Sequence, residues 1–279
     1  MRGRWQALLV AVVGSVSILF CWISAAAVAL VTLRKGAGEG AWLLLWALLP
    51  ALVVAWSMGD SSYLALIAGT GLLAQVLRVT VSLSLTLLAS VAVGVGGGLL
   101  MLTLGSGYLE QLNTALVEPY MAYLEQNLSQ AGEAVTLPRP TTVTIAGMIG
   151  TGTASMSVLC LLLGRYWQSA LYNPGGFGKE FRALRYPVGV SVALVLAVLA
   201  LSSLGMEMRT WAMVAMVPLS FAGLGLVHAR AAHRRWSAGW VLLFYGAWLL
   251  IGAVQLMVVF LAVADSWLDF RQRWSNADT

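Results

Sequence analysis

The side chains of this sequence that could take part in chemistry do not form a known catalytic pattern. The two histidines, His228 and His233, stand among arginines, and the two cysteines, Cys21 and Cys160, lie inside apolar runs. The sequence contains no G-x-x-x-x-G-K-[ST] loop, no H-E-x-x-H helix and no G-x-S-x-G elbow. We therefore predict no enzyme activity, no catalytic or metal site, no cofactor and no ATP-driven motor within this chain.

Polar side chains inside apolar segments indicate a different kind of site. Tyr245, Trp248, Gly252 and Gln255 follow one another at steps of three, four and three residues, so they share one face of a helix. This stripe either lines a binding site by hydrogen bonding and stacking, or packs against a neighbouring helix to which Gln255 is bonded.

A second stretch is rich in small and hydroxyl-bearing residues. Gly147, Thr151 and Ser155 repeat every four residues, as Gly94 and Gly98 do in an earlier segment. This spacing allows helix backbones to approach closely in lipid, but the same residues could form a polar wall facing a small-molecule cavity. Together the two stretches give these ligand-facing candidates: Thr151, Ser155, Tyr245, Trp248 and Gln255.

The joint at residues 164–187 carries more aromatic and basic residues than a connector needs. Its Asn-Pro-Gly-Gly sequence at 173–176 predicts a sharp turn. Aromatic and basic side chains together suit a lipid interface, so the joint is an anchor, a headgroup contact or a docking site for a partner. The candidates are Arg165, Trp167, Tyr172, Asn173, Phe177, Phe181 and Arg182.

A short acidic pattern follows the last apolar run. Asp265 and Asp269 are one helical turn apart and Arg271 comes two residues later. The simplest interpretation is a structural salt bridge, either between Asp269 and Arg271 or to another helix. A catalytic pair of carboxylates is a remote alternative.

Composition shows what kind of element must position these residues. The chain is 60% hydrophobic and 10% charged, whereas soluble domains carry about 25% charged residues. Its apolar blocks are long enough to cross the hydrocarbon layer as helices, which takes about 20 residues, and they lack the alternation of a barrel. We predict an all-α bundle of transmembrane helices, with residues 1–279 as one integral membrane domain.

Eight spans are expected, at residues 7–33, 41–58, 61–77, 82–104, 143–163, 188–204, 210–227 and 240–264. The first could instead be a secretory signal peptide, because Arg2 and Arg4 precede it and small residues occur within it. Its length and the Arg34-Lys35 pair that follows favour a retained span.

The longest joint, residues 105–142, is acidic and is therefore assigned to the outside. Between Leu109 and Leu124 its apolar residues recur mostly every three or four positions, which predicts an amphipathic helix interrupted or restarted at Pro119. That helix either covers a cavity or is a connector packed on the helix ends.

Strict alternation from this joint places most of the 16 Lys and Arg residues inside, including those of the joint 164–187. It also places both termini outside, unless a break in the first or last block returns a terminus to the cytoplasm. The sequence pI is about 9.5, but the scattered basic residues do not indicate nucleic acid as a partner.

Three segments carry a family resemblance: residues 33–36, the joint from Gly164 through Phe177 to Arg182, and the closing Asp265-x-Trp267-x-Asp269-Phe270-Arg271. With these segments the whole chain resembles the YybS-like family of bacterial membrane proteins. The resemblance implies a distant similarity to the substrate-capturing membrane subunits of energy-coupling-factor vitamin transporters, and hence a helical bundle that binds a small molecule. It assigns no ligand and no site residue.

The leading hypothesis is a multi-pass protein of the bacterial inner membrane, related to transport, that binds a small molecule or a lipid within its bundle. Energy-coupled transport would require an ATPase partner from another chain. The alternative is a membrane scaffold that docks a partner through residues 165–185. An enzyme acting on lipid is least favoured, because no nucleophile and base converge in sequence.

Overall fold

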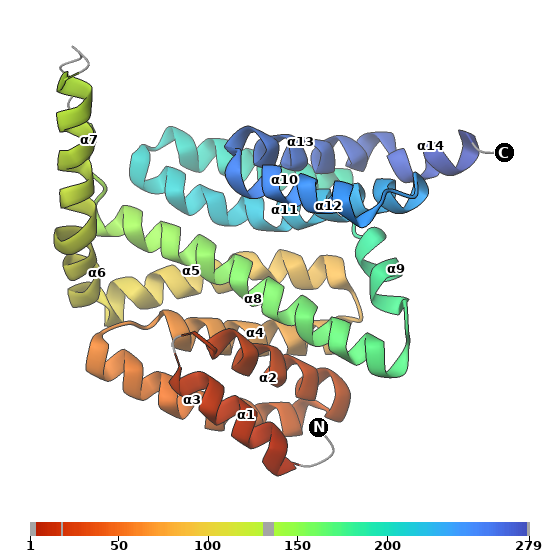
Figure 1. Cartoon of the computed structure of the whole chain (residues 1–279), viewed down its shortest axis with the longest axis horizontal. Coiled ribbons are helices and arrows are strands. Elements are labelled where there is room, and N and C mark those ends of the chain that lie inside the picture. The colour runs from red at the N-terminus through yellow and green to blue at the C-terminus, as the bar shows by residue number, and fades with distance from the viewer. Residues whose placement is uncertain (1–3, 18, 131–136, 278–279) are drawn as a thin grey trace.

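The chain folds into helices, as the composition predicts. The computed structural model describes residues 4–17, 19–130 and 137–277, and this part contains no strand. Its elements, drawn in Figure 1, are α1 (Arg4–Val16), α2 (Cys21–Lys35), α3 (Ala37–Met58), α4 (Ser62–Thr80), α5 (Leu83–Leu104), α6 (Ser106–Leu112), the π-helix η1 (Asn113–Val117), α7 (Glu118–Gln130), α8 (Thr142–Tyr172), α9 (Gly176–Arg182), α10 (Val188–Ser203), α11 (Met206–His233), α12 (Ala238–Leu250), α13 (Gly252–Leu268) and α14 (Phe270–Ala277).

Five of the described helices are long and apolar enough to cross a membrane: α3, α4, α5, α8 and α11. They correspond to five of the predicted spans, and the chain is a helical membrane protein. The span predicted at 188–204 is the apolar helix α10, which has 16 residues. It is shorter than the roughly 20 residues that a helix needs to cross the hydrocarbon layer unaided.

The first predicted span, 7–33, is not one helix. It consists of α1 and α2, between which the chain reverses direction (Figure 1). Gly14, Ser15 and Ser17 lie at the reversal, and such residues favour turns and caps over helix interiors. The hydroxyl of Ser24 donates to the carbonyl oxygen of Ala11 over 2.7 Å and joins the two helices.

The last predicted span, 240–264, is also broken. Helices α12 and α13 meet at an angle of 109°, and Ile251 between them has an extended backbone. The break leaves the carbonyl of Trp248 without its helical partner, and the side-chain amide of Gln255 donates to it over 2.9 Å. This bond reduces the cost of irregular backbone at membrane depth.

Both broken blocks bring their termini to the same end of the bundle (Figure 1). We call this the basic end; it holds the ends of α2, α8 and α11 and the helix α9. There Arg271 donates to the carbonyl of Leu184 over 2.9 Å, and Arg230 lies 4.7 Å from the ring centre of Trp274. Strict alternation predicted the termini at the opposite end; the described residues instead follow the alternative, in which a break in the first and last blocks returns the chain to the basic end.

The opposite, acidic end carries α6, η1 and α7, which run across the ends of the long helices (Figure 1). Leu109 on α6 is fully buried, whereas Tyr120 and Tyr123 on α7 are exposed. The helical prediction is confirmed, and the π-helix ends at Val117, two residues before Pro119, which has no N–H to donate. Arg2 and Glu133 lie outside the described residues.

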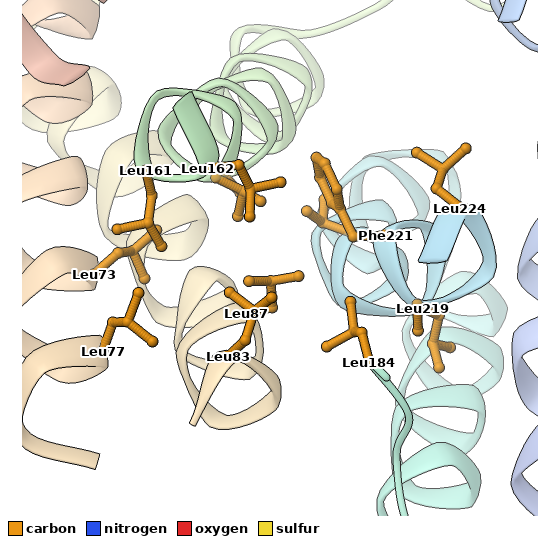
Figure 2. Packing of buried hydrophobic residues seen from close by; sticks show 14 of the residues in the cluster. Leu73, Leu77, Leu83, Leu87, Leu161, Leu162, Leu184, Leu219, Phe221 and Leu224 are labelled. Atoms are coloured by element: carbon orange, nitrogen blue, oxygen red, sulfur yellow. The ribbon is translucent and has the colours of Figure 1, made fainter. Parts of the chain in front are cut away.

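Helix α8 is the centre of the bundle and packs against α2, α4, α5 and α11. Figure 2 shows leucines of α4, α5 and α8 meeting side chains of α11. Leu73, Leu87 and Leu161 in this cluster are fully buried. Gly94 and Gly98 of α5 lie directly against the backbone carbonyls of Gly150 and Ala146 on α8, so the four-residue spacing of small residues in α5 serves close packing, as one interpretation predicted.

Candidate functional site

A groove of about 750 Å³ lies between α8, α9, α11, α12 and α13. This volume is in the range of binding pockets for small molecules, about 300–1,000 Å³. Five lining residues were expected to face a ligand from their spacing alone. They are Thr151, Ser155, Tyr245, Trp248 and Gln255.

Helix α11 supplies the long wall of the groove. Arg209, Met213, Met216, Ser220 and His228 all line it, and their spacing of four, three, four and eight residues keeps them on one helix face. This face of α11 was not predicted from the sequence. The same search for a stripe that found Gln255 would have detected it.

Aromatic rings form a continuous wall near the basic end of the groove. The rings of Phe177 and Phe181 stack at 5.9 Å, and the ring of Phe181 meets that of His228 at 5.6 Å. His228 is also hydrogen-bonded to the hydroxyl of Tyr245 over 2.8 Å, and Tyr245 contacts Trp248 edge to face. The joint 164–187 and the broken last block thus contribute to one site.

The hydroxyl groups of the groove are held by their own helices. Thr151 donates to the carbonyl of Gly147 over 3.0 Å, and Ser220 donates to that of Met216 over 3.0 Å. Both oxygens can still accept a hydrogen bond. The buried indole N–H of Trp248, by contrast, has no acceptor among the described residues, so it is available to a ligand oxygen.

The charged side chains that line the groove are arginines at its two ends. Arg182 lines its basic end and Arg209 its acidic end, and no carboxylate lines it among the residues that the structure describes. The side chain of neither arginine has a hydrogen bond or an ion pair in that part of the chain. Most other described arginines differ, as Arg165 shows by its 2.8 Å ion pair with Glu180.

The groove opens on the side of the bundle rather than being enclosed. Three of its lining residues, Leu159, Met213 and Leu256, are 50%, 47% and 61% exposed. Because these residues lie within the apolar helices α8, α11 and α13, the opening faces lipid. A molecule could therefore enter from the membrane.

The remaining candidates of the joint 164–187 serve mainly to hold the structure together. Trp167 packs on the core formed by α1 to α4 and α8. Tyr172 lies under the guanidinium of Arg34, 4.9 Å from it. The Asn173 carbonyl accepts from Ser169 over 2.7 Å, and Gly175 has the positive φ of 84° that the predicted turn requires. Residues 170–175 of the joint nevertheless remain exposed, with the Leu171 and Tyr172 side chains 61% and 57% exposed, so this part of the joint is still open to a partner.

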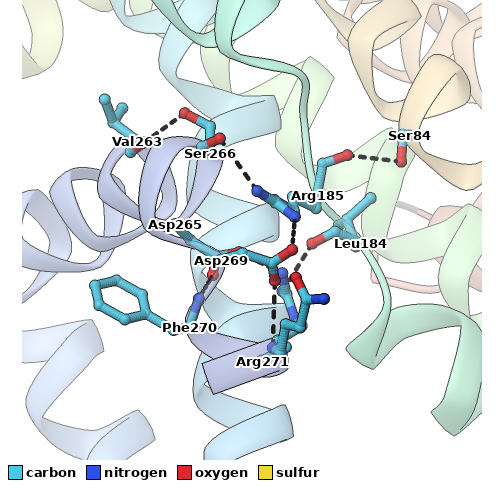
Figure 3. A network of polar contacts seen from close by, with 10 residues as sticks. Ser84, Leu184, Arg185, Val263, Asp265, Ser266, Asp269, Phe270 and Arg271 are labelled. Carbon is cyan, nitrogen blue, oxygen red and sulfur yellow. Dashed lines mark hydrogen bonds and ion pairs between the residues drawn. The ribbon is translucent and has the colours of Figure 1, made fainter. Parts of the chain in front are cut away.

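The acidic pattern at the basic end forms a network with the joint (Figure 3). Arg271 pairs with Asp265, which is 2% exposed, and Asp269 pairs with Arg185 from the segment after α9. Arg185 also donates to the carbonyl of Ser266 over 3.1 Å. The inter-helix salt bridge is therefore present between Asp265 and Arg271, and in the described part of the chain Asp269 pairs with Arg185 rather than with Arg271. We call these four side chains the polar knot.

The groove and the polar knot share the joint 164–187 and the segment that runs from α12 to α14. The knot holds the end of α13 against that joint, and α13 supplies Gln255 and Leu256 to the groove. All residues that form the groove therefore come from this one chain.

No family model matches the chain, and no curated protein and no solved structure is detectably similar to it.

Proposed function

We propose that this chain is a transport-related protein of the bacterial inner membrane that binds a lipid in the groove between α8, α11 and the α12–α13 pair. The observation that supports this most strongly is the side opening of an apolar groove of about 750 Å³ within helices that face the membrane. A water-soluble ligand would have to cross lipid to reach this opening. The membrane itself supplies an amphipathic molecule at high local concentration.

The proposal includes the orientation of the chain in the membrane. Among the described basic residues, Arg139 and Arg209 lie at the acidic end and the others at the basic end or on the approach to it. Since basic residues favour the cytoplasmic side, the basic end is assigned to the cytoplasm. The two broken blocks improve this bias, because they return both termini to that side.

The binding role requires no catalytic group and is consistent with the resemblance to the YybS-like family, which we retain as a proposal. It also ranks above the scaffold hypothesis on a specific ground. Phe177 and Phe181, which would have been exposed docking residues, pack against the core and line the groove. An ATPase partner, if transport is energy-coupled, would bind the exposed surface of the basic end outside the groove, which includes residues 170–175.

Native mass spectrometry of the detergent-extracted protein tests the proposal. Wild-type protein should retain a membrane lipid at fixed stoichiometry. Ser220→Phe, which fills the groove, should release it, whereas Leu196→Phe on exposed α10, outside the groove, should not. Wild-type protein that carries no lipid, or a Ser220→Phe variant that keeps it while staying folded, would overturn the proposal.

A further inference from the structure

The two arginines that line the groove, Arg182 and Arg209, lie at its opposite ends. A rise of 1.5 Å per residue separates Arg209 from His228 by about 28 Å along α11. Arg182 lies at the level of His228, because the adjacent Phe181 ring is 5.6 Å from the His228 ring. The distance between the two guanidinium groups is thus close to the thickness of the hydrocarbon core, about 30 Å.

Polar groups are present at several depths between these ends. Thr151 lies near Arg209, since its hydroxyl approaches the carbonyl of Thr210 at 3.5 Å. Gly223 packs on the backbone of Val258, which sets Gln255, one turn earlier in α13, near the middle of α11. Ser220 is at the same depth, and the Trp248 N–H and the Tyr245 hydroxyl follow toward the basic end.

Such a series is not needed to hold an acyl chain. An apolar tail requires only apolar walls, and polar groups in the membrane interior are costly unless they are used. A headgroup that moves across the membrane does need hydrogen-bonding partners at each depth, because an unpartnered charge in hydrocarbon is strongly disfavoured. The tails meanwhile can stay in the bilayer, since the groove opens to its side.

We propose that the groove is a path by which a phospholipid with an anionic headgroup passes between the two leaflets, its phosphate moving between Arg209 and Arg182. The inference rests on the proposed lipid-binding function and adds an activity to it. The choice of an anionic phospholipid follows from charge. Two cationic groups and no carboxylate line the groove in the part of the chain that is described, and guanidinium groups bind phosphate well.

The test uses the full chain reconstituted into phosphatidylcholine vesicles that contain a trace of phosphatidylglycerol with a fluorescent tail. Dithionite added outside destroys the dye of the outer leaflet only. In protein-free vesicles the inner-leaflet signal should persist. With wild-type protein it should decay, because the inner lipid reaches the outer leaflet. A fluorescent-tailed phosphatidylcholine probe should decay more slowly.

Three variants examine the path. Arg182→Gln and Arg209→Gln should each slow the transfer about tenfold or more, the usual effect of losing a hydrogen bond to a charged group. Ser155→Leu should block the middle of the groove while leaving both arginines. The matched controls are Arg234→Gln at the basic end, Arg139→Gln at the acidic end and Gly152→Ala on α8, where an added Cβ meets no other atom. These controls should transfer lipid at the wild-type rate.

The outcomes separate this inference from the proposed function. Protein that retains a lipid in native mass spectrometry but does not accelerate decay in vesicles would overturn the path and leave the binding role intact. Transfer that is unchanged in folded Arg182→Gln, Arg209→Gln and Ser155→Leu would also overturn it. Loss of both lipid retention and transfer in the wild type would remove both proposals.

Discussion

At the scale of single residues, the polar knot combines a buried carboxylate with a partly buried guanidinium. Asp265 is 2% exposed and its partner Arg271 is 19% exposed by side chain. Burial lowers the pKa of Arg271, and the neighbouring Asp265 carboxylate counteracts this. Removing either charge therefore leaves the other one buried without its partner.

Replacing Asp265 should destabilise the protein severely. Asp265→Ala leaves the Arg271 charge without its carboxylate, and breaking a buried pair in this way costs about 3–5 kcal/mol. Thermal unfolding in detergent would measure the loss. As a control, Glu125→Ala removes the partner of Arg139, which is 54% exposed, and should cost no more than about 1 kcal/mol. Equal effects of the two changes would contradict this account of the knot.

Tyr186 makes the stability of the protein sensitive to alkaline pH. Its phenol is buried and donates to the carbonyl of Ser84 over 3.2 Å, and burial raises the pKa of Tyr186 above its ordinary value. The folded state therefore keeps the proton more tightly than the unfolded chain does. This contribution is complete below about pH 10, the ordinary pKa of tyrosine, and is lost as the pH rises above it.

We expect Tyr186→Phe to reduce that loss. The variant should be slightly less stable than the wild type near pH 8, because it lacks the hydrogen bond, which is worth about 1 kcal/mol. Between about pH 8 and pH 11 its melting temperature should fall less than that of the wild type. Parallel slopes for the two proteins would show that Tyr186 is not the group responsible.

At the scale of elements, the contact between α5 and α8 depends on glycines that lack space for a methyl group. A Cβ at Gly150 would lie 2.5 Å from the carbonyl oxygen of Gly94, whereas a Cβ at Gly96 meets nothing within 4 Å. The backbone of Gly94 cannot move aside as the end of a flexible side chain can. The same substitution should therefore have opposite effects at the two positions.

Gly150→Ala should destabilise the bundle by about 1–3 kcal/mol, as overpacking of a core does. Gly96→Ala should be neutral or stabilising by up to about 1 kcal/mol, because alanine favours a helix more than glycine does. Thermal unfolding of both variants in the same detergent provides the comparison. Two similar melting temperatures would mean that the helices can separate to accept the methyl group.

The elements also show what the sequence could and could not predict. Block length and apolarity were sufficient to find α3, α4, α5, α8 and α11. The breaks inside 7–33 and 240–264 were not located, because apolarity continues through them and only local backbone choices at Ile251 and around Gly14 to Ser17 interrupt the helices. Helical periodicity correctly placed Thr151 and Ser155 on one face of α8. The single helix face predicted for Tyr245, Trp248 and Gln255 is wrong, because the break at Ile251 divides them between α12 and α13, which meet at 109° and both line the groove. Arg182 and Arg209 were not recognised as a pair, since their relation depends on how α9 packs against α11.

At the scale of the whole molecule, the two broken blocks set the topology. They place α14 next to Leu184 and Arg230, at the end of the bundle opposite α7. The acidic α7 and the C-terminal helix should therefore be accessible from opposite sides of the membrane. The two native cysteines are buried, so introduced cysteines can report this against a low background.

Ser129→Cys, on exposed α7, should react with a membrane-impermeant maleimide added to intact spheroplasts. Arg273→Cys, on exposed α14, should react only after the membrane is opened. Quantified labelling of each variant before and after lysis gives the result. Labelling of Arg273→Cys in intact spheroplasts would mean that the last block crosses the membrane after all, and the orientation of the groove would have to be reassigned.

The sequence separation within the polar knot has a consequence for biosynthesis. Arg185 is synthesised and inserted well before Asp269, to which it binds, and the α12–α13 pair lies between them in chain order with α10 and α11. Until the ribosome has released residues near Arg271, one wall of the groove is missing and the Arg185 side chain has no carboxylate. During synthesis the groove is therefore incomplete on one side until the last helices are inserted. This late step is the one at which an insertase or chaperone would matter most.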